Sequence, residues 1–329
     1  MILGIESTAH TFGIGIVDNG KILSNVKDSY TTEKGGIIPV EAAKHHEKVA
    51  EELFQKALNE AGITAKQIKA VAFSQAPGLA PCLIVGMKFA KKKAKELNVP
   101  VVPVNHCVAH LEIGRVTGAT DPVLLYASGA NTQIIAYAGG KYRVFGETLD
   151  TGIGNFIDTF ARYAGLGFPG GPKIAELAAK SNEKNYIELP YSIKGMDVAF
   201  SGILTKLRQM LESRKYKLED LSFSLQETAF AMLIEAAERA LAHTGKEELL
   251  LGGGVACNKR LQEMCRIMCS ERGCKFFCPE NSLLVDNAGM IAFLGEIMFN
   301  NRIKISGKDI EKLDINPRER TDDVDVKWK

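Results

Sequence analysis

Short apolar runs alternate with longer amphipathic segments along the chain, and this pattern predicts a mixed α/β fold. Residues 3–5 and 12–17 have the length and apolar content of buried strands. The dipeptide Asn19-Gly20 predicts a tight hairpin after the second strand, because both residues tolerate positive φ. Residues 222–243 place apolar side chains at helical spacing, so we expect a long packed helix there.

The opening pattern is repeated later in the chain. Residues 123–144 match residues 3–24 in their order of strand, polar turn, strand and hairpin. Two copies of one hairpin, each followed by helices and further strands, predict a duplicated fold with a cleft between the halves. The polar turns at 6–8 and 128–131 would face each other across this cleft, where free backbone amides can bind phosphate or carboxylate oxygens.

The length of the chain also favours two lobes. Its 329 residues exceed the roughly 250–300 at which a single hydrophobic core stops growing. We expect a first lobe over residues 1–120, to which residues 300–320 return, and a second lobe over residues 121–299. Residues 305–329 are charged and poor in apolar side chains, so we expect a linker tail or a connection that crosses between the lobes.

Composition and charge narrow the class of protein. The chain is 46% hydrophobic and 24% charged, as ordinary globular proteins are. Its net charge of +2 does not by itself indicate binding to nucleic acid or to an anionic membrane. No apolar run reaches the ~18 residues of a membrane span. Seven cysteines and no signal-peptide pattern indicate a cytoplasmic location, and the four within residues 265–278 lack the CxxC pairs of a zinc module.

The strongest candidate for chemistry is the pair His106 and His110. Their spacing puts both on one face of a helix, where they can bind one metal ion. The preceding apolar run, residues 99–104, predicts a strand, and open α/β sheets keep their ligands at the carboxyl ends of strands. Two half-exposed imidazoles without a metal are the alternative. A zincin protease is disfavoured, because Cys107 occupies the position of its catalytic glutamate.

Further segments carry residues that could bind a ligand or could be purely structural. A strand, the glycines Gly252 to Gly254 and a helix follow one another, which is a nucleotide-binding layout, although a glycine run alone is weak evidence. Asp158 and Asp286 lie at helix starts, where either could be only a cap. The lysine-rich helix expected at 81–97 could contact phosphate or could simply be solvated.

Several linked motifs identify a family that the chain resembles. It is similar to the TsaD family of tRNA threonylcarbamoyladenosine transferases, in the archaeal and eukaryotic branch once labelled O-sialoglycoprotein endopeptidase. The resemblance runs from Met1 to about Phe299 and implies the duplicated two-lobe fold of actin, Hsp70 and sugar kinases. The motifs are LGIESTAHTFGIGIV, FSQAPGL, VNHCVAHLEIG, YASGANTQ, GETLDTGIGNFIDTFAR, FPGGPKI, GMDVAFSG, SLQETAF, LGGGVACNKRL and DNAGMIA.

The resemblance implies specific ligands. One metal ion per chain, iron (Fe²⁺) favoured and zinc possible, would be held by His106, His110, Tyr126 and Asp286. An adenylate, either threonylcarbamoyl-AMP or ATP/AMP, would lie in the cleft. Its phosphate and acyl part would contact the turn Tyr126, Ala127, Ser128, Gly129 and Ala130. Its ribose would contact Asp158 and Gly171. Its adenosine end would contact Gly253, Gly254 and Asn258.

Two positions depart from the family pattern. Relatives carry a glutamate that reaches the nucleotide where this chain has Ala175, and the nearest acid here is Glu176. Ala130 stands where glycine is usual, which stiffens the turn slightly.

The implied reaction moves a threonylcarbamoyl group from its anhydride with AMP to the exocyclic amine of the adenosine after the anticodon in tRNA. We expect Glu6 and Ser7 to project into the cleft as proton acceptor and orienting donor, although Glu6 could equally be a structural residue of the turn. The resemblance also implies the partners of a KEOPS complex, namely a small dimerising subunit and an atypical Rio-like kinase. The alternatives are an ATP-dependent phosphotransferase of the same fold and an obligate binding subunit.

Overall fold

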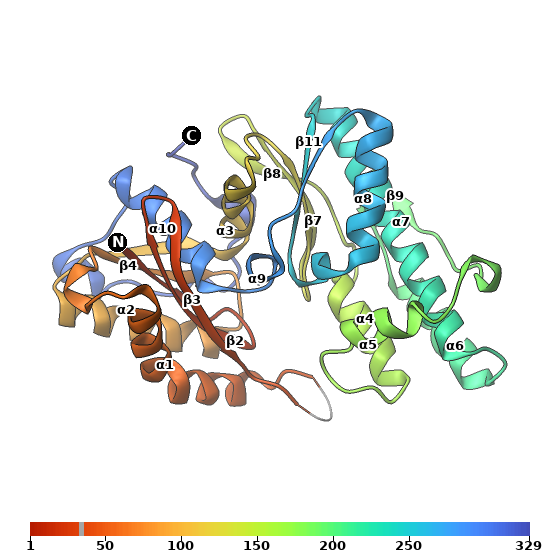
Figure 1. The fold of residues 1–329 in the computed structure, drawn as a ribbon, viewed down its shortest axis with the longest axis horizontal. Coiled ribbons are helices and arrows are strands. Elements are labelled where there is room, and N and C mark those ends of the chain that lie inside the picture. Colours follow the sequence, from red (N-terminus) through yellow and green to blue (C-terminus); the bar gives the residue numbers. More distant parts are fainter. Residues whose placement is uncertain (33–35) are drawn as a thin grey trace.

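Two five-stranded mixed sheets form the centres of two lobes in the computed structural model, which describes residues 1–32 and 36–329 (Figure 1). The first sheet has the order β3-β2-β1-β4-β5, and the second has the order β12-β11-β6-β7-β8. The strands are β1 (Ile2–Glu6), β2 (Thr11–Asp18), β3 (Lys21–Ser29), β4 (Ala70–Ala76), β5 (Val101–Asn105), β6 (Val123–Ala127), β7 (Thr132–Ala138), β8 (Lys141–Glu147), β11 (Glu248–Gly252) and β12 (Lys275–Phe277).

The two sheets have the same topology. In the first, β1 pairs antiparallel with β2 and parallel with β4, and β4 pairs parallel with β5. In the second, β6 pairs antiparallel with β7 and parallel with β11, and β11 pairs parallel with β12. The expected duplication of a hairpin followed by crossover strands is therefore confirmed. A short hairpin of β9 (Ile193–Lys194) and β10 (Asp197–Val198), which we did not predict, is added to the second lobe.

Helices cover the sheets and join them. In the first lobe α1 and α2 pack on one face of the sheet and α10 packs on the other, while α7 packs on the second sheet. The helices are α1 (Pro39–Ala61), α2 (Ala80–Leu97), α3 (His106–Glu112), α4 (Ile153–Tyr163), α5 (Gly171–Ala178), α6 (Ser201–Ser213), α7 (Leu218–Thr244), α8 (Lys259–Arg272), α9 (Asn281–Leu284) and α10 (Ala288–Asn300), with 3-10 turns at η1 (Ala65–Gln67), η2 (Ile113–Thr117), η3 (Glu183–Asn185), η4 (Gly254–Cys257), η5 (Gly307–Ile310) and η6 (Thr321–Asp323).

Glycines in the first hairpin let α10 approach the sheet closely. A Cβ atom at Gly4 would lie 2.4 Å from the carbonyl oxygen of Ala288, and one at Gly15 would lie 2.6 Å from its carbonyl carbon. Only a residue without a side chain fits such backbone contact. Helix α10 thus packs on the first sheet, although we placed its residues in the second lobe. The lobe bounds at residues 120 and 299 stay predictions.

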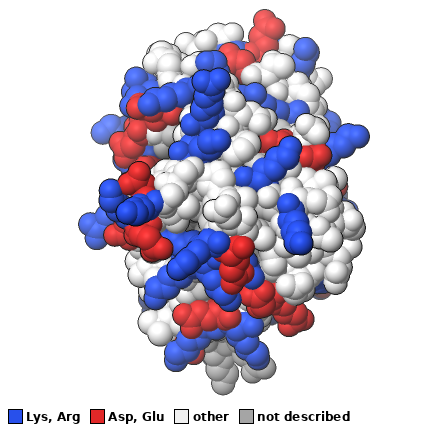
Figure 2. All heavy atoms as spheres, turned by 90° about the vertical axis from the view of Figure 1, so that its left-hand side faces the viewer, with Lys and Arg blue, Asp and Glu red and all other residues white. Residues whose placement is uncertain are grey.

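The lysine-rich helix α2 uses several of its cations inside the lobe. Lys93 is buried, and its Nζ lies 2.7 Å from Glu51 of α1 and 3.1 Å from Glu96. Lys91 donates hydrogen bonds to the backbone carbonyls of Glu311 and Leu313. On the side of the molecule formed by this lobe, basic and acidic side chains are interspersed (Figure 2). Among the described residues on this face, we therefore see no single-sign surface of the kind that a phosphate-binding role would favour.

The segment after α10 returns to the first sheet. Ile305 exchanges two backbone hydrogen bonds with Val101 of β5, and Ile310, Leu313 and Ile315 pack against the core of the first lobe. No helix among the described residues is long and apolar enough to span a membrane.

Candidate metal centre and nucleotide cleft

Helix α3 starts directly at the carboxyl end of β5. Asn105 caps it, because its side-chain oxygen accepts hydrogen bonds from the backbone N–H groups of Cys107 (3.0 Å) and Val108 (3.2 Å). His106 and His110 follow one helical turn apart, and both are buried. The fixed start of the helix therefore directs both imidazoles to one place.

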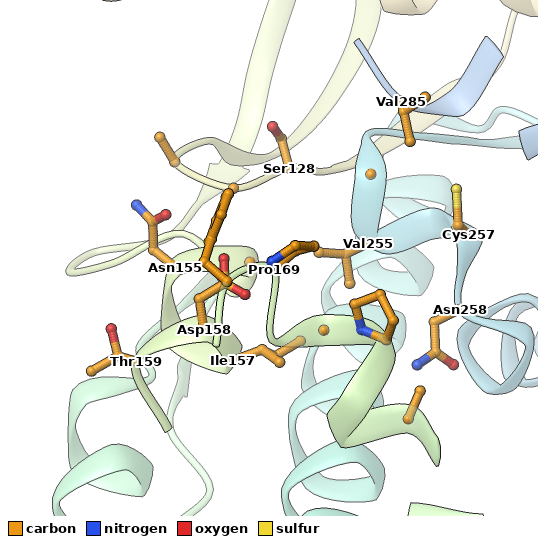
Figure 3. Close-up of a pocket in the computed structure, with 18 of the residues that line it drawn as sticks. Ser128, Asn155, Ile157, Asp158, Thr159, Pro169, Val255, Cys257, Asn258 and Val285 are labelled. Carbon is orange, nitrogen blue, oxygen red and sulfur yellow. The ribbon is translucent and has the colours of Figure 1, made fainter. Parts of the chain in front are cut away.

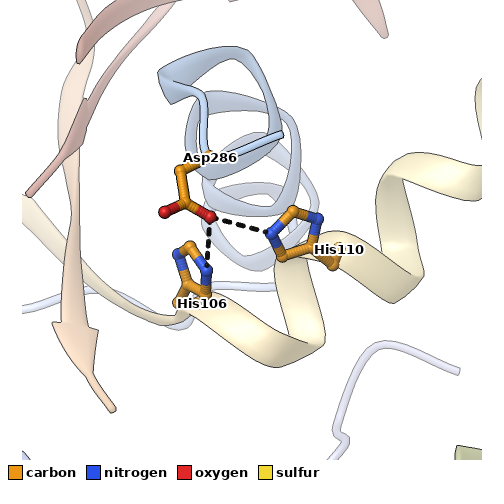
Figure 4. A group of neighbouring side chains, drawn as sticks. All are labelled: His106, His110 and Asp286. Atoms are coloured by element: carbon orange, nitrogen blue, oxygen red, sulfur yellow. Dashed lines mark ion pairs between the residues drawn. The ribbon is translucent and has the colours of Figure 1, made fainter. Parts of the chain in front are cut away.

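Asp286, just ahead of α10, meets these two histidines (Figure 4). Its Oδ1 lies 3.3 Å from His106 Nε2 and 3.5 Å from His110 Nε2. Two ligand atoms each about 2.1 Å from a tetrahedral ion are about 3.4 Å apart, so these separations fit one metal ion. Among the described residues no other group of three His, Cys, Asp or Glu side chains has such geometry, and the cysteines of residues 265–278 form none.

The charge state of the group also suits a cation. Neither ring nitrogen of His110 has a hydrogen-bond partner among the described residues, and burial lowers its pKa, so its ring is neutral and available as a ligand. Burial opposes ionisation of His106 and Asp286, but their mutual attraction holds the pKa of Asp286 well below its usual range. Together with Glu6, Asp286 holds the pKa of His106 well above its usual range. A metal ion would replace the His106 proton.

Tyr126 of β6 lies beside the group. Its ring centroid is 4.9 Å from that of His110, and it is buried. Burial raises the pKa of Tyr126 well above its usual value, and the neighbouring Cys107 and Asp286 add to this effect. The phenol is therefore protonated without a cation, and binding of Tyr126 as phenolate would release a proton.

A cavity of about 2310 Å³ lies between the lobes beside this group. Figure 3 shows Ser128, Asp158 and Asn258 around it. The predicted site residues that line it are His106, Tyr126, Ser128, Gly129, Ala130, Asp158, Gly171, Gly254, Asn258 and Asp286.

Two predicted contacts lie behind the cavity wall. Ala127 and Gly253 are not among the described residues that line it. A Cβ atom at Gly253, whose φ is 89°, would lie 2.4 Å from the carbonyl oxygen of Ala127. The absence of a side chain at Gly253 therefore lets the chain after β11 pack against the end of β6.

Comparison with known proteins identifies the family. The family model of TsaD, tRNA N6-adenosine threonylcarbamoyltransferase, matches residues 21–293. The chain belongs to the TsaD family. A Thermococcus kodakarensis protein named tRNA N6-adenosine threonylcarbamoyltransferase is 55% identical, with 99% of each chain covered. A Methanosarcina mazei protein named probable bifunctional tRNA threonylcarbamoyladenosine biosynthesis protein is 52% identical over 99% of this chain and 59% of its own length.

Solved structures confirm the expected fold class. HypF of T. kodakarensis superposes with a TM-score of 0.62 at 16% identity, over 95% of this chain and 49% of that chain. An activator of 2-hydroxyisocaproyl-CoA dehydratase from Clostridium difficile, with bound ADPNP, superposes with a TM-score of 0.53 at 13% identity, over 93% and 99%. At such low identity these likenesses establish the two-lobe α/β fold of this TsaD family member and nothing about its substrate.

The first turn of this TsaD chain differs from our expectation. Glu6 and Ser7 are buried and are not among the described residues that line the cavity, so our prediction that they project into the cleft is wrong. Glu6 is the last residue of β1 and faces α3, where its Oε2 lies 2.9 Å from His106 Nδ1. Its Oε1 accepts a hydrogen bond from Thr8 N (2.7 Å). The side chain of Ser7 packs under α2, 1.9 Å from where a Cβ of Gly86 would be.

Asp158 and Asn258 have structural partners as well as cavity exposure. The Asp158 carboxylate accepts a hydrogen bond from Gly170 N (2.8 Å), and burial raises the pKa of Asp158 above its usual value. Asn258 caps α8 by accepting from Arg260 N (2.8 Å), and its amide donates to Gln226 (2.9 Å). The cap interpretation of Asp158 is therefore wrong for its own helix α4, which Gly152 precedes, whereas Asn258 both caps α8 and lines the cavity.

Glu176 does not line the cavity, where the family resemblance implies a glutamate. Ala175 lines the cavity, whereas Glu176 is exposed on α5 and lies 3.0 Å from Lys180. The acid has moved to the next helical position, which points about 100° away.

One cation of the cleft could not be predicted from any sequence pattern. Lys27 lines the cavity from the edge strand β3, and its Nζ lies 3.4 Å from the backbone carbonyl of Asp286. A single lysine in a strand belongs to no motif. Its position in the cleft follows only from the pairing of β3 with β2 and from the position of α10.

Proposed function

We propose that this chain transfers the threonylcarbamoyl group of threonylcarbamoyl-AMP to the exocyclic amine of the adenosine that follows the anticodon in tRNA. Membership of the TsaD family and relatives named as this transferase over their whole length support the activity. At the site, one observation carries it: three metal-ligand side chains meet beside a cavity of about 2310 Å³. Small-molecule sites have roughly 300–1,000 Å³, so a nucleotide and an extruded base can both fit.

We propose that His106, His110, Tyr126 and Asp286 hold one metal ion, with iron favoured and zinc possible. The ring of His110, which makes no hydrogen bond among the described residues, and the ionised Asp286 support this assignment. A bound ion of either kind supplies Lewis-acid polarisation of an acyl or phosphoryl oxygen.

The second lobe would bind the adenylate. Ser128 N already donates to the Asn131 carbonyl (2.9 Å), so we assign the phosphate to the amides of Gly129 and Ala130. Asp158 and Gly171 would take the ribose, and Gly254 and Asn258 the adenosine end. Gly253 would act by shaping the wall rather than by direct contact.

Glu6 would act through His106. A carboxylate on the second nitrogen of a metal-binding imidazole fixes its tautomer and orientation. With Nδ1 held by Glu6 at 2.9 Å, Nε2 of His106 is left to face Asp286. We therefore assign Glu6 a positioning role instead of proton transfer from the substrate.

Elemental analysis and a transfer assay test the proposal. The purified chain, before and after chelation, is supplied with threonylcarbamoyl-AMP and unmodified tRNA. We expect iron or zinc near one per chain and loss of transfer in His110→Ala, with normal activity in the matched control His243→Ala on the exposed end of α7. Full transfer by His110→Ala would exclude the metal role. Transfer of the γ-phosphate of ATP to a small molecule with Mg²⁺ alone would instead favour the phosphotransferase.

We further propose that the chain works in the cytoplasm with tRNA and with the two KEOPS partners, a small dimerising subunit and a Rio-like kinase. The exposed sides of α1 and α2 would be the docking surface. Transfer by the isolated chain, compared with transfer after both subunits are added, distinguishes an autonomous enzyme from an obligate subunit.

A further inference from the structure

A buried carboxylate at the end of α3 has no part in the proposed reaction. Glu112 is 1% exposed. Its Oε1 accepts hydrogen bonds from the hydroxyl of Tyr142 in β8 and from the indole N–H of Trp328 (2.7 Å). Its Oε2 lies 2.5 Å from Arg115 Nε. Two donors from distant parts of the chain and one ion pair with the nearby Arg115 therefore meet on one acid, two residues after His110.

The segment that carries Trp328 also reaches the other end of α3. We call residues 319–328 the strap. Glu319 accepts a hydrogen bond from the side chain of Asn105 (2.9 Å), the residue that caps α3. Thr321, two residues further along the strap, is buried. The strap thus contacts both ends of the helix that bears the two histidines.

The strap joins the two lobes. Just before it, the backbone of Pro317 accepts a hydrogen bond from Gly78 N (3.2 Å) in the first lobe. Within it, Arg320 lies 3.3 Å from Glu147, and Asp325 lies 3.4 Å from Lys141, both at the ends of β8. Figure 1 shows this end of the chain passing close to α3 and β8.

Helix α3 needs such support. It has seven residues, and an isolated helix shorter than ~12 residues is marginal in water. Ligand side chains must be held within about 0.5 Å of their bound geometry by the residues packed around them. A buried carboxylate that loses a donor destabilises its surroundings, so the contact with Trp328 is coupled to the end of α3.

We propose that the strap is a positioning element for the metal centre, in which Trp328 and Glu112 hold the carboxyl end of α3 and thereby the ring of His110. The proposal rests on the metal-binding role given above. Trp328 and Glu112 are positioning residues, because neither is a ligand.

Cobalt binding tests the strap without tRNA or adenylate. Co²⁺ is titrated into the metal-free full chain and followed by its visible absorption. We expect Trp328→Ala to bind Co²⁺ about tenfold more weakly, with a changed band shape, as is typical when a supporting residue of a metal site is lost. Trp328→Phe keeps an aromatic ring but loses the N–H, so its affinity should be intermediate. Lys327→Ala, at the exposed neighbouring position, should bind like the unchanged chain.

Amide hydrogen exchange separates positioning from general stability. In Trp328→Ala we expect faster exchange in residues 106–112 and unchanged exchange in β1 and β4. Unchanged exchange in α3 with unchanged Co²⁺ affinity would overturn the proposal, as would equally faster exchange throughout both lobes. If the unchanged chain bound no Co²⁺, the metal role itself would be excluded, and the exchange pattern would still decide whether the strap holds α3.

Discussion

The turns that open the two lobes have the same topology and both line the cavity, the first through Thr8, but the surroundings of their other residues differ. In the first, Glu6 is fully buried and faces His106, whereas in the second Ser128, Gly129 and Ala130 line the cavity. Helices α3 and α10 pack against the first hairpin and enclose its acid. A repeated pattern therefore fixes where a turn lies, and the elements packed on it decide whether it supports a ligand or contacts a substrate.

The sheets under these turns differ in the same sense. Gly4 and Gly15 face the backbone of α10, while Leu124 and Ile135 hold the equivalent positions of β6 and β7. Close backbone contact brings Asp286, at the start of α10, to the histidines. In the proposed function, the first lobe would therefore supply most of the metal ligands, with Tyr126 from the second lobe, and the second lobe would bind the nucleotide.

The largest effects should come from removing one side chain of the metal centre and, separately, one side chain of the nucleotide site. We expect Asp286→Ala to lower metal affinity and transfer more than about 100-fold, beyond the loss typical of a residue that only supports a ligand, with nucleotide affinity kept. Asn258→Ala should lower AMP affinity about tenfold, as loss of one or two hydrogen bonds does, with metal affinity kept. Calorimetric titration with Zn²⁺ and with AMP measures both. If each variant lost both metal affinity and AMP affinity, the proposed separation of the metal site from the nucleotide site would be contradicted.

Some of this division was predictable from the sequence. The hairpin at Asn19-Gly20, its repeat and the pairing of His106 with His110 follow from local spacing, and each is confirmed by the strands and the helix observed. Asp286 and Tyr126 were predicted as metal ligands only through family resemblance, because no local pattern relates residues so far apart in the chain.

The rest depended on contacts that local patterns do not encode. The burial of Glu6 requires α3 to pack on β1, and the position of α10 requires the glycines of another element. Trp328 lies in a charged segment of low apolar content, yet its indole N–H donates a hydrogen bond to the buried Glu112.

A side chain at Gly4 should break the contact on the first sheet. Gly4→Ala puts a methyl group against backbone atoms of α10 that cannot move independently, so we expect a loss of about 3 kcal/mol in unfolding free energy. Leu124→Ala, at the equivalent position, should cost about the same by leaving a cavity. Urea unfolding measures both. Gly202→Ala is the control, because nothing lies within 4 Å of its Cβ in α6. A cost below about 0.5 kcal/mol for Gly4→Ala would mean that α10 can shift.

The first turn should also make the chain sensitive to acid. His46 is buried against the Ala9 carbonyl (3.1 Å), and burial lowers its pKa to about 4. The unfolded chain takes up this proton near pH 6.5 and the folded chain only near pH 4, so stability is lost as pH falls through that window. The loss should be about 2 kcal/mol at pH 5 relative to pH 7.

Urea unfolding of the metal-free chain at the two pH values tests this. His46→Gln should lose less stability than the unchanged chain between pH 7 and pH 5, because it lacks the titrating group. His243→Gln, on the exposed end of α7, is the control and should follow the unchanged chain. Identical pH profiles for His46→Gln and the unchanged chain would show that His46 is protonated equally in both states.

The smallest effect is expected where the second lobe departs from its relatives. Glu176 is exposed and paired with Lys180, so Glu176→Ala should change AMP affinity less than about twofold, as surface substitutions do. Ala175 lines the cavity, and Ala175→Glu should raise AMP affinity by up to about tenfold if the new carboxylate accepts hydrogen bonds from the nucleotide. Weaker AMP binding in Glu176→Ala would show instead that α5 turns this acid into the cleft when the nucleotide binds. The nucleotide site would then form fully only with its ligand bound, whereas the metal ligands already lie together without the ion.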